Sequence, residues 1–160
     1  MIILHITPHL GGGIGKVLYG IIKQSIKSNS IFEHIIVCLD KPEDLQYIHK
    51  IHKCKCKIIE CPSINTLIQL MNKSDIVQLE YINNPIIFKY LCNITIPQIR
   101  LLVWSHTNGL FNPVVPIELI TKSNKCINTT KCQNNINDFV FASGGFEDFP
   151  IIDRINEKLS

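Results

Sequence analysis

At 160 residues the chain suits a single domain, and its 46% apolar and 18% charged residues argue against disorder because such a composition can bury a core. The net charge of +3 is small, and its 16 basic and 13 acidic residues are spread along the chain, which argues against a nucleic-acid partner. No apolar run approaches the roughly 18 residues that span a bilayer, so at most a peripheral membrane contact is expected.

The first apolar run, Ile2 to Thr7, lacks the basic flank and the length of a signal peptide and therefore indicates a strand. We expect a cytoplasmic protein on this basis. Its seven cysteines are then expected as free thiols rather than disulfides, because their number is odd and the compartment is reducing.

Further runs rich in Ile and Val alternate with helical stretches, which indicates βαβ units and a parallel sheet. The clear strand candidates are Ile2 to Thr7, His34 to Leu39, Lys57 to Cys61, Asp75 to Leu79, Arg100 to Ser105 and Asp138 to Ala142, with Cys126 to Thr129 as a weaker one. Because the runs are continuously apolar, as in strands covered on both faces, we predict an α/β fold. It is a Rossmann-like three-layer αβα arrangement with a six- or seven-stranded, mostly parallel sheet.

The best-defined helix is predicted from about Gly15 to Ser28, where the apolar residues fall on one stripe of a 3.6-residue repeat. Weaker helices are predicted at Pro42 to Ile51, Ile64 to Asn72, Pro85 to Cys92 and Pro116 to Ser123. The polar face of the first helix carries three lysines, and a solvated face is favoured for them. The alternative is that they rest on anionic lipid at the inner face of the membrane.

Residues 7–16, TPHLGGGIGK, follow the first strand and open the first helix, where an open α/β sheet binds ligands. Glycines let backbone amides approach phosphate oxygens, and a helix amino terminus adds partial positive charge. A Walker A loop is excluded because Leu10 and Val17 stand where Gly and Ser or Thr are required, and a dinucleotide fingerprint is excluded by Lys16. The alternative is that the glycines serve only a tight turn and close helix packing.

Histidines at three places in the sequence carry different expectations. His106 follows the apolar run that ends at Ser105, so its side chain is expected at the carboxyl edge of the sheet, or else as a hydrogen-bonded residue of the loop. His5 alternates inside the first strand and is predicted to be packed. A zinc site is weighed for one segment and disfavoured by its spacing; it contains His49, His52, Cys54 and Cys56.

Four segments in this order resemble the amino-terminal domain of GT-B-fold glycosyltransferases, particularly the retaining enzymes that build bacterial surface glycans. They are TPHLGGGIGKVL (7–18), DIVQLE (75–80), LVWSHTNG (102–109) and FVFASGGFEDFP (139–150). The resemblance implies that residues 1–150 form this acceptor-side domain and that residues 151–160 begin the crossover to a donor-binding domain, which we expect to be absent. The chain is thus expected to be a truncated half of a hexosyltransferase, inactive in isolation.

The resemblance also implies roles for residues. Gly12 and Gly13 match the Gly-Gly pair that approaches the donor diphosphate, and His106 matches a catalytic histidine near the reacting sugar. Residues expected to line the same cleft on the acceptor side are His9, Lys16, Glu80, Tyr81 and Asn108.

The implied substrates are a nucleotide-sugar co-substrate and a glycan or lipid-linked acceptor, in cell-surface polysaccharide synthesis. No cofactor is expected, and no metal, because the sequence contains no Asp-x-Asp motif. The main alternative is a non-catalytic binding domain or a subunit completed by a separate donor-binding chain. A dehydrogenase or ATPase is disfavoured by the loop spacing.

Overall fold

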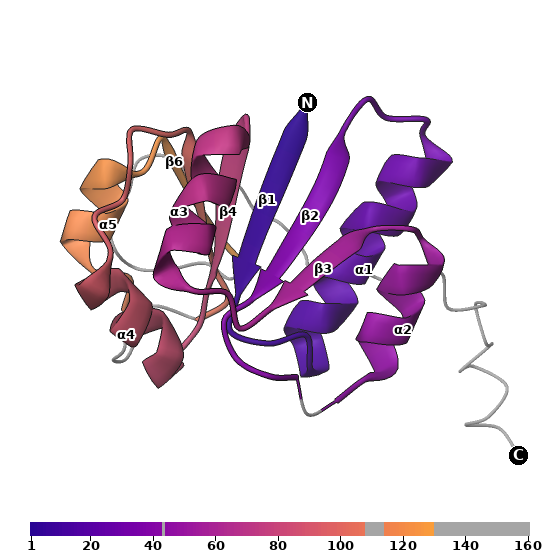
Figure 1. Cartoon of the computed structure of the whole chain (residues 1–160), viewed down its shortest axis with the longest axis horizontal. Helices are drawn as coiled ribbons and strands as arrows, with labels where there is room; N and C mark the ends of the chain where they lie inside the picture. Colours follow the sequence, from indigo (N-terminus) through magenta and orange to yellow (C-terminus); the bar gives the residue numbers. More distant parts are fainter. Residues whose placement is uncertain (43, 108–113, 130–160) are drawn as a thin grey trace, which may run out of the picture.

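The computed structural model of the chain describes residues 1–42, 44–107 and 114–129, in which strands and helices alternate strictly (Figure 1). In these residues the strands are β1 (Ile2–Thr7), β2 (Glu33–Cys38), β3 (Lys57–Glu60), β4 (Ile76–Tyr81), β5 (Leu101–Ser105) and β6 (Lys125–Asn128). The helices are α1 (Gly12–Lys27), α2 (Gln46–Lys53), α3 (Ile64–Lys73), α4 (Pro85–Asn93) and α5 (Ile117–Lys122).

The strands form one sheet in the order β3-β2-β1-β4-β5-β6, and every neighbouring pair is parallel. This is a Rossmann-like sheet, so the predicted fold class is confirmed. The weaker strand candidate at Cys126 is real and forms β6, whereas the candidate from Asp138 to Ala142 lies outside the described residues.

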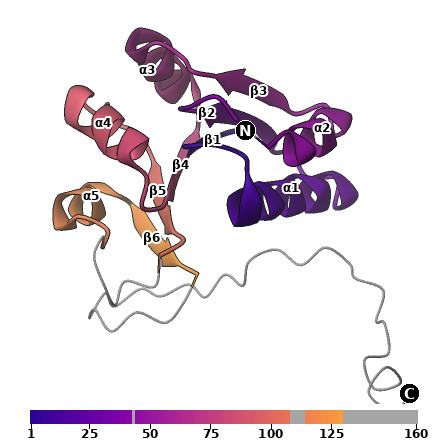
Figure 2. The same cartoon turned by 90° about the horizontal axis from the view of Figure 1, so that it is seen from below.

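Helices cover both faces of the sheet, as Figure 2 shows from below. One core contains apolar side chains of α1 and α2 with Ile36 and Cys38 of β2. The other contains side chains of α3, α4 and α5 with Leu4 and Ile6 of β1. Strand side chains alternate between the two cores because successive residues of a strand point to opposite faces.

Two helices begin three or more residues away from the predicted start, and α5 begins one residue later than predicted, at Ile117. Helix α1 begins at Gly12, three residues early, so the glycine pair belongs to its first turn; Gly11 occupies the N-cap position. Helix α2 begins at Gln46 rather than at Pro42; Leu45 is its N-cap residue, and the Asp44 carboxylate just before it accepts a hydrogen bond of 2.9 Å from the amide of Gln46. In the described part of the chain, no helix is long and apolar enough to cross a membrane.

Candidate functional site

A pocket of about 810 Å³ lies at the carboxyl edge of the sheet. Residues that follow five of the strands line it: His9 and the start of α1 after β1, Asp40, Lys41 and Asp44 after β2, Ile82 and Asn84 after β4, His106 after β5 and Thr129 after β6. Strands β1 and β4 are neighbours, but α1 and α4, which follow them, pack on opposite faces. Ligands of open α/β sheets bind at this kind of topological switch point.

One side of the glycine loop packs on the core, and the other side is open to the pocket. Leu10 is fully buried in the α1 side of the core, and the amide of Gly11 donates to Nδ1 of His9 at 3.1 Å. Gly12 has φ +59°, which disfavours any side chain, and no side chain caps α1. Gly12 and Gly13 are exposed and line the pocket, so the amides of this first turn are available to a ligand.

Glycine at position 15 is explained by packing rather than by access for a ligand. A Cβ atom there would lie 2.0 Å from the carbonyl oxygen of Leu10 and 2.7 Å from Cδ2 of Tyr47, whereas a Cβ on Gly13 would meet nothing within 4 Å. Close helix packing therefore explains Gly15 but does not explain Gly13.

His106 lines the pocket and is held from three directions. Its Nε2 lies 2.6 Å from Oε2 of Glu80, and its Nδ1 lies 3.5 Å from Oγ1 of Thr129. The ring stacks on Trp104, with 5.3 Å between centroids and 18° between planes. These contacts leave 12% of the side chain exposed and fix the imidazole against the wall of the pocket.

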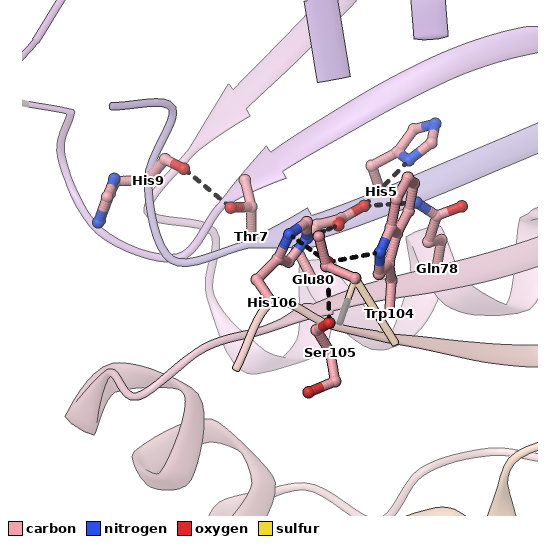
Figure 3. Close-up of polar contacts among 9 residues, drawn as sticks. His5, Thr7, His9, Gln78, Glu80, Trp104, Ser105 and His106 are labelled. Atoms are coloured by element: carbon pink, nitrogen blue, oxygen red, sulfur yellow. Dashed lines mark hydrogen bonds and ion pairs between the residues drawn. The ribbon is translucent and has the colours of Figure 1, made fainter. Parts of the chain in front are cut away.

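Glu80 is fully buried and lies behind His106 rather than at the pocket surface. Figure 3 shows the neighbouring side chains converging on its carboxylate: Nε2 of Gln78 donates to Oε1, and Nδ1 of His5 lies 3.6 Å from the same oxygen. Burial alone would raise the pKa of Glu80, but the hydrogen bond from His106 and the neighbouring His5 hold the pKa of this carboxyl below its usual value. The acid is therefore ionised and acts on the pocket through His106.

Tyr81 does not line the cleft, so that prediction is wrong. Its side chain is fully buried in the core on the α3 side, where its hydroxyl donates to the carbonyl of Val114 at 3.0 Å and its ring meets Phe88 edge to face. The physical reason is strand alternation: Glu80 points to the α1 side, so the next side chain points to the other.

The structure describes all but one of the other predicted site residues. His9, Lys16, Gly12 and Gly13 line the pocket together with His106, whereas Asn108 lies outside the described residues. The prediction that His5 is a packed histidine is confirmed, since it is 1% exposed.

Several pocket residues were not predicted: Asp40, Lys41, Asp44, Ile82, Asn84 and Thr129. Asp40 carried a usable signal, because it is the first charged residue after an apolar strand and the carboxyl ends of parallel strands meet at one edge. Thr129 carried none that distinguishes it from other residues at strand ends.

In the described residues, no group of three or more His, Cys, Asp and Glu side chains is placed to hold a metal ion. In the segment weighed for zinc, the Cys56 thiol is buried and donates to the carbonyl of His34 at 3.1 Å, while His49 and His52 are exposed.

Comparisons of the chain with protein-family models, curated proteins and solved structures find no match. The glycosyltransferase resemblance of the four sequence segments therefore stays a hypothesis, and the pocket is interpreted from its own geometry.

Proposed function

We propose that this domain is the acceptor-side half of a GT-B-fold glycosyltransferase, which transfers a sugar from a nucleotide-sugar donor to a glycan or lipid-linked acceptor. One observation carries the proposal: the His106 imidazole and the exposed first turn of α1 line the same pocket of about 810 Å³. Ligand pockets of roughly 300–1,000 Å³ enclose small molecules, and this volume suits a hexose with its diphosphate.

The diphosphate belongs at the α1 end of the pocket. Amides of Gly12 and Gly13 approach its oxygens, and Lys16, one turn further along α1, adds positive charge on the same wall. In the transfer step the bond between the anomeric carbon and the diphosphate oxygen breaks, a bond forms between that carbon and the acceptor hydroxyl oxygen, and the hydroxyl proton passes to the leaving diphosphate. The amides and Lys16 stabilise the negative charge that develops on the leaving oxygen. The proposed chemistry needs no metal, because amides and a lysine supply the positive potential.

The transferred sugar belongs beside His106, and the acceptor beyond it, toward His9. A hydrogen bond from the imidazole speeds transfer only if it strengthens as charge develops at the reacting carbon. A ring fixed by Glu80 and Trp104 meets the requirement that such a group be held in place before the reaction. In the proposed enzyme a second domain, in a longer chain or a separate one, binds the nucleotide, and the product enters a cell-surface polysaccharide.

The test of the diphosphate position uses Gly13, where an added Cβ atom would meet nothing within 4 Å and the fold should tolerate substitution. Inorganic pyrophosphate and uridine and guanosine diphosphate sugars are titrated into the ¹⁵N-labelled protein, and amide shifts are followed by NMR. We expect weak binding with shifts at residues 11–16, abolished by Gly13→Asp through charge repulsion and retained in the isosteric control Gly13→Asn. Equal loss in both variants, or no shifts in the unaltered protein, would contradict the proposal.

A non-catalytic binding domain is the second candidate, and one observation favours it: both ring nitrogens of His106 already have partners within the protein. The two candidates differ in an assay with a donor-binding domain supplied in trans. Sugar transfer that depends on His106 supports the enzyme. Ligand binding without any transfer supports the binding domain.

A further inference from the structure

Four titratable side chains form one row on the α1 side of the sheet: His34 of β2, His5 of β1, Glu80 of β4 and His106, which follows β5. His5 and Glu80 are buried, whereas His34 and His106 are partly exposed. Nδ1 of His34 lies 2.9 Å from Nε2 of His5, and Nδ1 of His5 lies 3.6 Å from Oε1 of Glu80. Oε2 of the same carboxylate lies 2.6 Å from Nε2 of His106, which lines the pocket. The row therefore connects the interior of the sheet to the pocket wall. Each hydrogen bond in it needs one donor and one acceptor, so the position of one proton limits the positions of the others.

The inner end of the row fixes two tautomers. One of the two nitrogens in the contact between His5 and His34 donates and the other accepts. If His5 donated, His34 would carry its proton on Nε2, which is buried without a hydrogen-bond partner. In the opposite arrangement His34 donates from Nδ1 and the proton of His5 lies on Nδ1, which also has no hydrogen-bond partner but lies 3.6 Å from Oε1 of Glu80. A proton that faces a carboxylate is favoured over one that faces no acceptor, so His34 donates from Nδ1. Neutral His5 then accepts at Nε2 and points its Nδ1–H at the carboxylate of Glu80.

Neutrality of His34 has separate support, since burial and the neighbouring His5 lower the pKa of His34 to about 4. In this arrangement His5 carries a single proton, on Nδ1, because its Nε2 accepts the hydrogen bond from His34. A buried carboxylate requires a compensating positive charge, and for Glu80 this charge must therefore come from His106 rather than from His5.

The outer end of the row supplies that charge. Thr129 Oγ1 has one proton, which it donates to the carbonyl of Ser105 at 3.1 Å, and it accepts from Nε1 of Trp104 at 3.1 Å. Its contact of 3.5 Å with Nδ1 of His106 is then satisfied only if that nitrogen carries a proton. Nε2 faces a carboxylate and needs a proton as well, so both nitrogens of His106 are donors.

We propose that Glu80 and neutral His5 are positioning residues that hold His106 as an imidazolium, whose Nδ1–H the pocket offers to an anionic oxygen of the ligand. The contact of Nδ1 with Thr129 is long, so a ligand oxygen can replace it, whereas the contact with Glu80 stays. Among the described residues that line the pocket, the other charged side chains are Lys16, Lys41, Asp40 and Asp44, and His9 is a further titratable one. A positive charge on His106 therefore makes this part of the lining more attractive to an anion. His106 then acts as a hydrogen-bond donor and not as a general base.

The ligand-free protein tests this inference, so its outcome does not depend on the proposed transferase function. Protein labelled with ¹⁵N-histidine is studied by long-range ¹H–¹⁵N correlation NMR at neutral pH, where an imidazolium gives two similar nitrogen shifts and a neutral ring gives two very different ones. Signals are assigned by His106→Gln and His5→Gln. We expect two protonated nitrogens for His106, and for His5 a protonated Nδ1 with an unprotonated Nε2. One unprotonated nitrogen in His106, or the opposite tautomer of His5, would overturn the inference.

Glu80→Gln tests the cause, because it keeps the shape of the side chain and removes its charge. In this variant the His106 ring is expected to be neutral at the same pH, while the exposed His49 and His52 give unchanged signals. If the folded Glu80→Gln protein kept both protons on His106, the proposed role of Glu80 would be wrong. If that variant does not fold, the tautomers of the unaltered protein still decide the inference.

Discussion

A buried carboxylate makes the substitutions around it depend on one another. Glu80 is fully buried, and His106 supplies its closest contact on the pocket side. Removing one member of a buried charge pair leaves the other without compensation, whereas replacing both can be nearly neutral. The consequence of losing His106 therefore depends on what stands at position 80.

We predict that His106→Ala lowers the free energy of unfolding by about 3 kcal/mol, because it strands the Glu80 carboxylate. Glu80→Gln combined with His106→Ala should cost at least about 1 kcal/mol less than the single variants add up to. Urea unfolding of all four proteins gives the coupling directly. Additive effects would mean that the pair is not coupled in the folded protein.

His34 should make stability depend on pH in a defined window. Its pKa is lowered to about 4 in the folded protein by burial and by His5, against roughly 6.5 in the unfolded chain. Between these values the unfolded chain binds more protons, so this stabilisation is complete above about pH 6.5 and is lost as the pH falls toward 4. We predict a smaller loss of unfolding free energy between about pH 7 and pH 5 in His34→Gln than in the unaltered protein. His52→Gln, an exposed control, should behave like the unaltered protein.

At the scale of elements, α1 combines an open end with a crowded second turn. Gly13 and Gly15 lie on the same helix, two residues apart, yet only Gly15 touches the loop carbonyl of Leu10 and the ring of Tyr47 on α2. One glycine thus leaves space for a ligand, and the other lets two helices approach.

We predict that Gly15→Ala destabilises the protein by about 1–3 kcal/mol, since the added methyl group forces α1 away from Leu10 and Tyr47. Gly13→Ala is the matched control and should be neutral or stabilising by up to about 1 kcal/mol, because alanine favours helix and meets no atom there. Urea unfolding at one pH compares the two. A tolerated Gly15→Ala would show that the helix contact is looser than its geometry suggests.

Element type was predictable from the sequence, but side-chain direction was not. Apolar runs such as Ile2 to Thr7 gave strands at the right places because β-branched residues bounded by polar ones seldom form anything else. The direction of Glu80 and Tyr81 had no such signal, since a strand covered on both faces carries apolar residues on each side. Besides Gln78 of the same strand, the partners of Glu80 come from β1 and from the residue after β5, and no local pattern brings these distant residues together.

At the scale of the whole molecule, the pocket has walls from α1 and from residues that follow β2, β4, β5 and β6, and the nucleotide of the proposed donor needs a further wall. We predict that the 160-residue chain binds nucleotide sugars only weakly and transfers no sugar until a donor-binding domain is supplied. Calorimetry with several uridine and guanosine diphosphate sugars, followed by a transfer assay in trans, measures both. Micromolar binding by the chain alone would mean that the donor site is misplaced.

The stacked pair beside the pocket also gives the protein an optical property. Trp104 is the only tryptophan in the sequence, its indole lies 5.3 Å from the His106 ring, and its Nε1 donates to Thr129. A protonated imidazole quenches indole fluorescence by contact, whereas a neutral one does so poorly. The tryptophan fluorescence of this chain therefore reports on the charge of His106 at the pocket wall. The emission should increase when His106 loses its charge, and no attached dye is needed.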